Sequence, residues 1–529
     1  MAIKVACSKS TEEKPGMLRR ALFVLIMLSL AGVAIVLLIT KPGVGVNGDA
    51  VWYLQGAQNI LSGHGYSIER GDGFLPITMF PPFYSILLAL FGASGIPISD
   101  IARILNAALF GYTVFLSGWL IYRLSKEVWA GIVGSAIIVL FRDLIFVHAW
   151  ALTEPLYIAL TLTCLAITAL YLQSSRERYL AIASLFAGLA VITRYVGLSL
   201  VASLCVWSLG FDHKSWNQRL RNTIMAGVIG FLPLAGWMMR NRLLGLTAVG
   251  RSGVVLHQPP LETLKAFPDT IWNWFVPGAI HVRFVYRFLL VAGGLVLLGM
   301  VIVIVLKKDK DKAFFLLRSQ IILMIIYMFT YVFTVLASIA LALAGSPFSW
   351  QATGVARYLT PLFPWFIMLI SILGARWRGL VRKYGQFVRY LPMVPAAVLI
   401  AFYSLRLISV LSQPVSLGYT DIKTSRPDLV VTLQDIASKR PIVTNNYEMI
   451  YFLVGRPVYS IPGPTDELTG MKNPVHDALM SRVKAVVDEG AAVVIFRPPG
   501  EEYFFDSWLN QLKIYKDFGD FKIYLAETY

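Results

Sequence analysis

The chain has little charge for its length. Asp, Glu, Lys and Arg make up 15% of its 529 residues, whereas about 25% is usual in soluble globular proteins. Hydrophobic residues reach 57%, and apolar runs of roughly 20 residues, the length that spans a bilayer, recur along the sequence. This composition excludes an ordinary soluble enzyme and predicts a polytopic membrane protein.

Cysteine is also scarce. The 3 cysteines, Cys7, Cys164 and Cys205, lie in the N-terminal tail and in apolar runs. They offer no disulfide framework in a polar region, so cysteine usage does not diagnose the redox compartment.

Nucleotide- and metal-binding motifs are missing. The sequence has no P-loop, no glycine-rich dinucleotide fingerprint after a strand and no Cys/His zinc spacing. Its 6 histidines show no paired spacing. No metal site and no cofactor are therefore predicted. A divalent metal ion stays open as an alternative, because His64 and His148 are expected on the same membrane face as Asp49.

The positive charge that is present follows the membrane pattern. The net charge of +17 comes from lysines and arginines gathered in short loops between apolar runs, as the positive-inside rule describes. This distribution argues against nucleic acid as a partner. It places the N-terminus in the cytoplasm and, with an odd number of crossings, the C-terminus outside.

The apolar runs predict about eleven transmembrane helices. The first is longer than a signal-peptide core and is expected to be retained. The runs fall roughly at 20–40, 99–122, 128–141, 150–172, 179–192, 195–210, 221–239, 288–306, 320–343, 358–374 and 391–411.

Two domains are expected. Residues 1–411 form the transmembrane domain, with large external loops at 41–98 and 240–287. Residues 412–529 change character: short apolar strands near 441–445, 457–461 and 491–496 alternate with helices at 447–454 and 474–489. This alternation predicts a small extracytoplasmic α/β domain.

The stretch after the first run places a carboxylate at a membrane surface. From Asp49 onward, apolar residues gather on one helical face, while Gln55, Gln58 and Asn59 fall on the other. This pattern is typical of a helix lying in the interface plane. Asp49 can cap that helix or serve as a catalytic base, and the two roles are compatible. A second helix is expected at 81–92, with proline in its first turn.

Two further acids need an account. Glu154 precedes Pro155 at the outer start of the fourth expected helix, where an acid also suits the helix dipole. Shared topology puts Glu154 on the same face as Asp49, so the two could divide the work at one interfacial site. Asp143 is expected in a short, solvated loop.

Two arginines are expected on that same outer face. Arg194 lies between two short apolar stretches, and Arg357 opens the tenth expected helix. Arg194 could extend its guanidinium group to the lipid headgroups while its aliphatic stem stays in the apolar region. Together they could instead clamp a lipid phosphate, because a guanidinium matches phosphate oxygens bidentately.

Several short motifs occur in a characteristic order. After Asp49 come Phe80-Pro-Pro-Phe-Tyr84, Leu152-Thr-Glu-Pro-Leu156, Gly188-Leu-Ala-Val-Ile-Thr-Arg194, Ala356-Arg-Tyr-Leu-Thr-Pro-Leu362 and, in the tail, Val443-Thr-Asn-Asn-Tyr447 with Gly455-Arg-Pro457. As a set over nearly the whole chain, they resemble the GT-C glycosyltransferases, near the protein O-mannosyltransferase and lipid A aminoarabinose transferase group.

The resemblance implies a polyprenyl-phosphate-linked sugar as donor and transfer on the outer side of the membrane. It implies Asp49 as general base, Glu154 as the second acid and Arg194 as the basic residue ending the fifth helix. Two positions depart from the relatives: Ala50 follows Asp49 where mannosyltransferases of eukaryotic type have paired acids, and Met79-Phe80 stand where aminoarabinose transferases have Glu-Lys.

The residues and the resemblance agree on a chemistry. An inverting transfer from a lipid phosphate needs a base and positive charge for the departing phosphate, and it needs no nucleotide site. We expect Asp49 and Glu154 to be catalytic, and Arg194 and Arg357 to bind the donor phosphate. The residues expected to line the substrate cavity are Trp52, Tyr53, His64, Pro82, Tyr84, Asp143, His148, Tyr195 and Tyr358.

The expected partners are the lipid-linked sugar donor, a glycan, lipid or protein acceptor, and membrane lipids. The expected location is the cytoplasmic membrane of a bacterium or archaeon. The alternative is a transporter or flippase of lipid-linked saccharides without transferase activity. Such a protein usually shows matching halves with broken helices, and the sequence shows no such symmetry.

Overall fold

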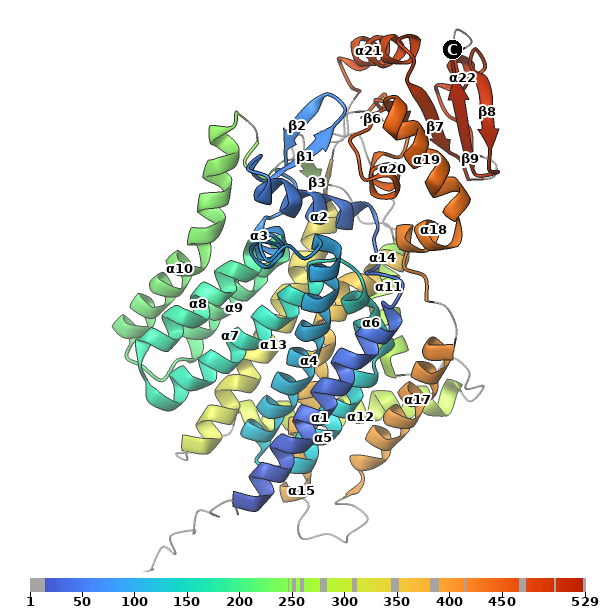
Figure 1. Cartoon of the computed structure of the whole chain (residues 1–529). Coiled ribbons are helices and arrows are strands. Elements are labelled where there is room, and N and C mark those ends of the chain that lie inside the picture. Colours follow the sequence, from blue (N-terminus) through green and yellow to red (C-terminus); the bar gives the residue numbers. More distant parts are fainter. Residues whose placement is uncertain are drawn as a thin grey trace, which may run out of the picture.

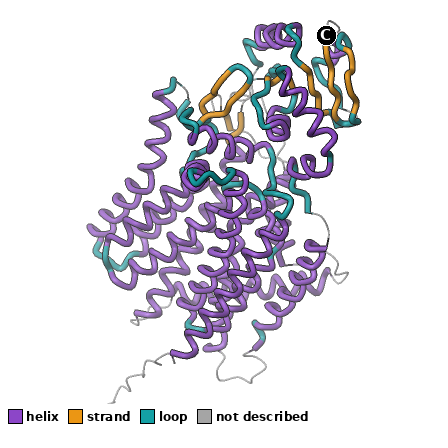
Figure 2. The backbone as a smooth tube through the Cα atoms, viewed as in Figure 1, coloured by secondary structure: helices purple, strands orange, loops and turns teal. Residues whose placement is uncertain are grey.

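A computed structural model describes residues 15–245, 247–249, 254–256, 261–275, 283–306, 312–343, 352–380, 390–412, 415–465, 472–498 and 501–526. Most of these residues belong to long helices that run roughly side by side, and a small sheet region lies beyond one end of them (Figures 1 and 2). The polytopic helical architecture is therefore confirmed.

The membrane region is built from helices of very different lengths. In chain order they are α1 (Pro15–Ile39), α4 (Ile98–Ser125), α5 (Val128–Leu140), α6 (Arg142–Ala149), α7 (Glu154–Ser174), α8 (Glu177–Val191), α9 (Leu198–Phe211), α10 (Trp216–Leu243), α11 (Leu261–Phe275), α12 (Arg283–Leu306), α13 (Lys312–Ala340), α14 (Ala352–Leu359), α15 (Phe363–Leu380) and α17 (Met393–Ser412). Short 3₁₀ turns, η1 (Tyr195–Gly197) and η2 (Thr360–Leu362), precede α9 and α15.

The apolar runs predicted to span the membrane fall mainly on helices, although residues 341–343 of the run at 320–343 form a strand. Among the described residues, 7 helices are long and apolar enough to cross a bilayer, or 8 if the bent pair α5–α6 counts as one span. The other predicted spans coincide with shorter described stretches: α8, η1 with α9, and the Gly293–Leu306 part of α12.

The bend between α5 and α6 changes the position of Asp143. The backbone of Phe141 is extended (ψ 111°), and the two helices meet at 59°. The chain then resumes as a helix, so Asp143 lies in the first turn of α6. The predicted short loop around Asp143 is wrong, because one extended residue suffices to redirect the chain.

Small residues allow α1, α4 and α5 to pack closely. A Cβ atom at Gly118 of α4 would lie 2.0 Å from Ser135 Oγ of α5 and 2.6 Å from Leu25 Cδ2 of α1. Close backbone approach through small residues is how membrane helices associate, because lipid supplies no hydrophobic drive between them. Large side chains with at least half of their surface exposed cover the outside, including Phe23, Leu232, Phe329, Phe333 and Leu405.

Two short helices lie across the end of the bundle, below the sheet region (Figure 1). They are α2 (Gly48–Leu61) and α3 (Phe83–Gly92), and an antiparallel hairpin of β1 (Ser67–Arg70) and β2 (Gly73–Pro76) runs between them. The predicted start of α3 at residue 81 is two residues early, because Pro82 is its N-cap.

Only part of the predicted polar face of α2 is exposed to solvent. Gln55 and Asn59 are buried and donate to the backbone oxygens of Glu69 and Ser67 in β1, at 3.0 and 2.9 Å. Only Gln58 of the three amides is exposed. The prediction fails for Gln55 and Asn59 because a hairpin contributed by later residues covers them.

The C-terminal residues form a mixed five-stranded sheet in the order β6-β5-β7-β9-β8. Strands β5 (Ile442–Thr444), β6 (Tyr459–Ser460) and β7 (Ala492–Phe496), with helices α20 (Tyr447–Val454) and α21 (His476–Asp488), match the predicted elements. The sequence analysis missed α18 (Tyr419–Ser425), α19 (Pro427–Lys439), α22 (Asp506–Leu509), β8 (Lys513–Asp517) and β9 (Phe521–Leu525). A separate pair, β3 (Val254–Leu256) with β4 (Leu341–Leu343), is antiparallel.

Candidate functional site

Four charged side chains from distant parts of the sequence meet at the end of the bundle that faces the sheet region. Asp49 comes from α2, Glu154 from α7, Arg194 from the link between α8 and η1, and Arg357 from α14. A continuous series of ion pairs joins them. The fold thus brings together the four residues that the sequence analysis ranked highest.

Asp49 is not the cap of its helix. Asn47 is the N-cap of α2, and its side chain accepts a hydrogen bond from the backbone of Ala50 at 3.0 Å. Asp49 stands in the first turn, where an acid favours the helix dipole. Because Asn47 takes the capping role, the Asp49 carboxylate points elsewhere: its Oδ2 accepts from Arg357 Nη1 at 3.2 Å, and its side chain is 38% exposed.

Glu154 is the centre of the cluster. It opens α7, with Pro155 next in the helix, and its side chain is fully buried. Its Oε1 accepts from Arg357 Nε at 2.6 Å and pairs with Arg194 Nη1 at 2.7 Å. A buried carboxylate needs such partners, because removing its charge from water is costly.

The two arginines share one aromatic neighbour. The guanidinium carbons of Arg194 and Arg357 lie 5.8 and 5.9 Å from the ring centre of Tyr358. Arg194 also donates to Thr153 Oγ1 at 3.0 Å. Side-chain exposure is 12% for Arg194 and 26% for Arg357, so both cations reach the surface of the cluster while Glu154 does not.

Two polar atoms of this cluster are buried without a hydrogen-bond partner among the described residues. They are Glu154 Oε2 and Arg194 Nε. Buried polar groups are nearly always satisfied in folded proteins, so each such atom points to a water, an ion or a ligand. Arg194 Nε is a free donor of the kind that an anionic oxygen would accept from.

Aromatic residues line the next layer. Phe80 lies 5.8 Å from Trp52 and 5.3 Å from Tyr53, and Tyr53 lies 5.8 Å from Tyr84, all measured between ring centres. Burial raises the pKa of Tyr53 well above its usual value, and the negative charge of Asp49 adds to the shift. Tyr53 therefore stays a neutral phenol beside the charged cluster.

Three further residues predicted to line the cavity, Tyr195, Tyr84 and Pro82, also lie near these aromatic side chains. The Tyr195 hydroxyl accepts from Trp237 Nε1 at 2.9 Å and donates to the backbone oxygen of Thr78 at 3.5 Å. The Tyr84 hydroxyl donates to Asn106 Oδ1 at 3.2 Å, and Pro82 begins the helix that carries Tyr84.

Three other predicted cavity residues make different contacts. His64 stacks on Phe74 at 3.8 Å between ring centres, and buried His148 contacts the backbone oxygen of Leu144 through Nδ1 at 2.7 Å. Within the described ranges, no ion pair or hydrogen bond joins His64, His148 or Asp143 to the four charged residues. Nor do the described residues contain a group of three His, Cys, Asp or Glu side chains that could hold a metal ion.

The sequence analysis missed one acid at this site. Glu448, in the first turn of α20, accepts a hydrogen bond from Trp52 Nε1 at 3.1 Å. Burial raises the pKa of nearby Tyr419 to about 12, and the charges of Glu448 and Asp49 contribute to that shift. No local signal marks Glu448, because its partner lies 396 residues away.

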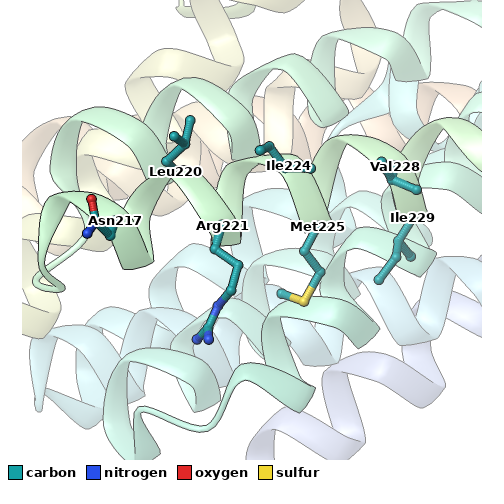
Figure 3. Close-up of a pocket in the computed structure, with 7 residues that line it drawn as sticks. All are labelled: Asn217, Leu220, Arg221, Ile224, Met225, Val228 and Ile229. Atoms are coloured by element: carbon teal, nitrogen blue, oxygen red, sulfur yellow. The ribbon is translucent and has the colours of Figure 1, made fainter.

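A hollow of about 580 Å³ lies elsewhere, along the first half of α10 (Figure 3). Its lining includes Leu220, Ile224 and Val228, and Arg221 at its edge is paired with Glu177. From Met225 in this hollow to Arg240, which bonds to Ile77 near the charged cluster, α10 rises about 22 Å at 1.5 Å per residue. The hollow is thus separate from the charged cluster.

The chain matches no family model and no curated protein. Two crystal structures of ArnT from Cupriavidus metallidurans are similar to it. The one bound to undecaprenyl phosphate has a TM-score of 0.50 at 14% identity, covering 94% of this chain and 97% of ArnT. The apo form has a TM-score of 0.51, also at 14% identity, with 96% of each chain covered.

The chain has the GT-C fold. The resemblance inferred from the motifs is thereby confirmed at the level of the fold. Arabinosyltransferase EmbB from Mycobacterium smegmatis is a more distant match, with a TM-score of 0.36 at 14% identity over 80% of this chain and 43% of EmbB.

Proposed function

We propose that this GT-C chain is a membrane glycosyltransferase that moves a sugar from a polyprenyl-phosphate carrier to an acceptor hydroxyl. The observation that carries the proposal is the series of contacts from buried Glu154 through Arg357 to half-exposed Asp49. It sets a base and two cations side by side at the end of a membrane bundle. ArnT, which shares the fold, was crystallised with undecaprenyl phosphate.

Arg194 and Arg357 bind the phosphate of the donor. Both arginine side chains are partly exposed. The buried Nε–H of Arg194 donates to no described residue, so it can donate to a phosphate oxygen. Two cations in a site of low dielectric stabilise the charge that develops on a departing phosphate more than they would in water.

Glu154 acts as a positioning residue. Its side chain is fully buried, so it does not reach an acceptor, but it holds both guanidinium groups through one oxygen. Glu154 thus holds the two cations at a fixed spacing. A bound donor phosphate gains their attraction without having to order them.

The transfer is a single displacement at the anomeric carbon. Asp49 takes the proton of the acceptor hydroxyl as the acceptor oxygen forms a bond to that carbon. The bond between the anomeric carbon and the phosphate oxygen breaks, and its electron pair leaves with the lipid phosphate. The configuration inverts, and the proton on Asp49 passes to solvent. No general acid is needed, because the phosphate is already a good leaving group.

We also propose a domain organisation and a membrane orientation for the chain. Residues 1–411 form the transmembrane catalytic domain with a cytoplasmic N-terminus, and residues 412–529 form an extracytoplasmic domain. The location is the cytoplasmic membrane of a bacterium or archaeon. The positive-inside distribution of lysine and arginine supports this orientation.

The test uses the purified full-length chain in lipid nanodiscs with a panel of labelled undecaprenyl-phosphate hexoses and pentoses. The acceptor source is a detergent-solubilised envelope fraction, and water serves as a second acceptor that releases free sugar. We expect the wild type to use at least one donor and Asp49→Asn to lower its kcat at least 100-fold, because the amide cannot take the proton. Asp435→Asn, an exposed acid of α19, is the matched control and should match the wild type.

Two outcomes would contradict the proposal. Full activity of Asp49→Asn would rule out Asp49 as the general base. Failure of the wild type to use any donor, together with movement of the lipid-linked sugar across a vesicle membrane, would support the transporter alternative.

A further inference from the structure

The C-terminal sheet region is attached to α2, which carries Asp49, and to the segment that precedes it. Val46 forms a parallel bridge with Gly418, and Tyr419 donates its backbone N–H to the Val46 oxygen at 2.9 Å. Thr420 Oγ1 donates to the oxygen of Val44 at 2.6 Å. These contacts hold the segment that leads into α2, two residues before the helix starts.

A second set of contacts holds α2 itself. The Tyr447 hydroxyl of α20 lies 2.7 Å from Gln55 Oε1 and 2.8 Å from the Glu69 oxygen. The backbone N–H of Gly71 donates to the oxygen of Val458 at 2.9 Å. The start of α20 is therefore held against the middle of α2.

Glu448 is the acid that this docking brings to the site. Asn446 caps α20 and fixes its first turn, in which Glu448 lies. The Glu448 Cγ atom is 3.9 Å from the position of a Cβ on Gly48, the neighbour of Asp49. Its Oε1 accepts from the indole of Trp52, one helical turn beyond Asp49. Asp49 and Trp52 are three residues apart and so share a face of α2.

We infer that Glu448 and Trp52 form the acceptor-binding side of the proposed transferase site and that the acceptor is an uncharged saccharide. This inference rests on the proposed function. The donor side is cationic, through Arg194 and Arg357, whereas this side offers carboxylates and an indole. The C-terminal region thus supplies a specificity-determining residue.

The chemistry of this side favours a sugar. A pyranose presents C–H groups on one face and hydroxyl donors around its rim. A half-buried indole ring fits the apolar face, and the ionised oxygens of Glu448 and Asp49 accept from hydroxyl groups in strong, charge-assisted bonds. The same two carboxylates disfavour an acidic sugar by like-charge repulsion.

A peptide acceptor fits less well. Peptides commonly bind by adding a strand to an exposed sheet edge. The edge strand of this sheet nearest to Gly71 and α2 is β6, which has only 2 residues, and both of its neighbours in the ladder, Val443 and Thr444, are in β5. That edge is too short to hold an extended chain in register.

The experiment measures two rates with the full-length chain and a labelled donor from the panel above. One is transfer to saccharide in the envelope fraction, and the other is release of free sugar to water. Glu448→Ala should lower the ratio of transfer to hydrolysis about tenfold through a raised KM for the saccharide. Glu448→Gln, whose amide oxygen still accepts from Trp52, should recover part of that ratio.

The matched control is Glu489→Gln, an exposed acid that follows α21 in the same region and should leave both rates unchanged. Parallel losses of transfer and hydrolysis in Glu448→Ala would mean that Glu448 only supports the fold, and this would overturn the inference, as would an unchanged ratio. Label recovered in protease-sensitive material would overturn the saccharide assignment alone. A wild type that neither transfers nor hydrolyses any donor would instead reject the proposed function, and this inference with it.

Discussion

Glu154 and Arg357 are 203 residues apart in the sequence, and their side chains meet at 2.6 Å. Glu154 is buried at the first position of α7, while Arg357 belongs to α14 and extends onward to Asp49. This pair therefore connects the interior of the bundle with the helix at its surface. Arg194 pairs with the same Glu154 oxygen, so three of the four charged side chains meet at this point.

Removal of the Glu154 charge should destabilise the protein strongly. In Glu154→Gln, Arg194 and Arg357 lose their shared counter-charge and face each other in a mostly buried position. Breaking a buried pair on one side typically costs about 3–5 kcal/mol. We expect a clear drop in the thermal midpoint of unfolding, measured by intrinsic fluorescence in nanodiscs.

The control for that variant is Glu177→Gln. Glu177 pairs with Arg221, but their side chains are 38% and 62% exposed, and exposed pairs contribute only about 0–1 kcal/mol. Equal shifts of the thermal midpoint in the two variants would show that the buried cluster contributes no more to stability than an exposed ion pair.

The two arginines should govern binding of the lipid phosphate. We expect Arg194→Gln and Arg357→Gln each to weaken the affinity for undecaprenyl phosphate at least tenfold, because a guanidinium–phosphate bond is charge-assisted and often bidentate. Isothermal titration calorimetry in detergent measures the dissociation constant. Arg482→Gln, with 60% of its side chain exposed, should bind like the wild type. Unchanged binding in both cluster variants would exclude them as the phosphate site.

Gly118 should tolerate no larger residue. In Gly118→Val, the new atoms would meet Ser135, Leu25 and the backbone oxygen of Gly131 at 3.0 Å or less. Overpacking typically costs about 1–3 kcal/mol, so we expect a lower thermal midpoint and poorer yield of monodisperse protein. Gly210→Val is the matched change on α9, where nothing lies within 4 Å of the added Cβ. Comparable behaviour of the two variants on size-exclusion chromatography would contradict this packing.

Tyr447 should hold the C-terminal sheet region against α2. Tyr447→Phe removes the hydroxyl that lies near Gln55 Oε1 and the Glu69 oxygen. The Glu69 oxygen keeps its bond from Gln55 Nε2, but Gln55 Oε1 loses this donor, at a typical cost of about 1–3 kcal/mol. We expect faster hydrogen exchange in α2, measured by mass spectrometry. Tyr515→Phe, with 58% of the residue exposed, should leave that exchange unchanged.

The sequence was informative where a local rule decided the structure. Apolar runs predicted the helical membrane bundle, although 7 of the described helices, or 8 with the bent pair α5–α6, are long and apolar enough to cross a bilayer against about eleven predicted. The buried strand Ala492–Phe496 was recognisable from its composition. It was misleading where a later segment changed the environment. Gln55 and Asn59 are polar residues on a helix, yet β1 buries them through backbone hydrogen bonds. Phe141 gave no sign that its extended backbone would break a span and set Asp143 on a new helix.

Hydropathy determined, by itself, that this is a polytopic membrane protein. The order of short motifs predicted the GT-C fold and made Asp49, Glu154, Arg194 and Arg357 the candidate site residues. Periodicity and hydropathy act over a few turns, so they can be read without a fold. Only the tertiary structure decided that Asn47, not Asp49, caps α2 and that one oxygen of Glu154 holds both arginines. It alone joined Glu448 to Trp52 across 396 residues, because which distant side chains meet depends on how whole helices and a separate sheet pack.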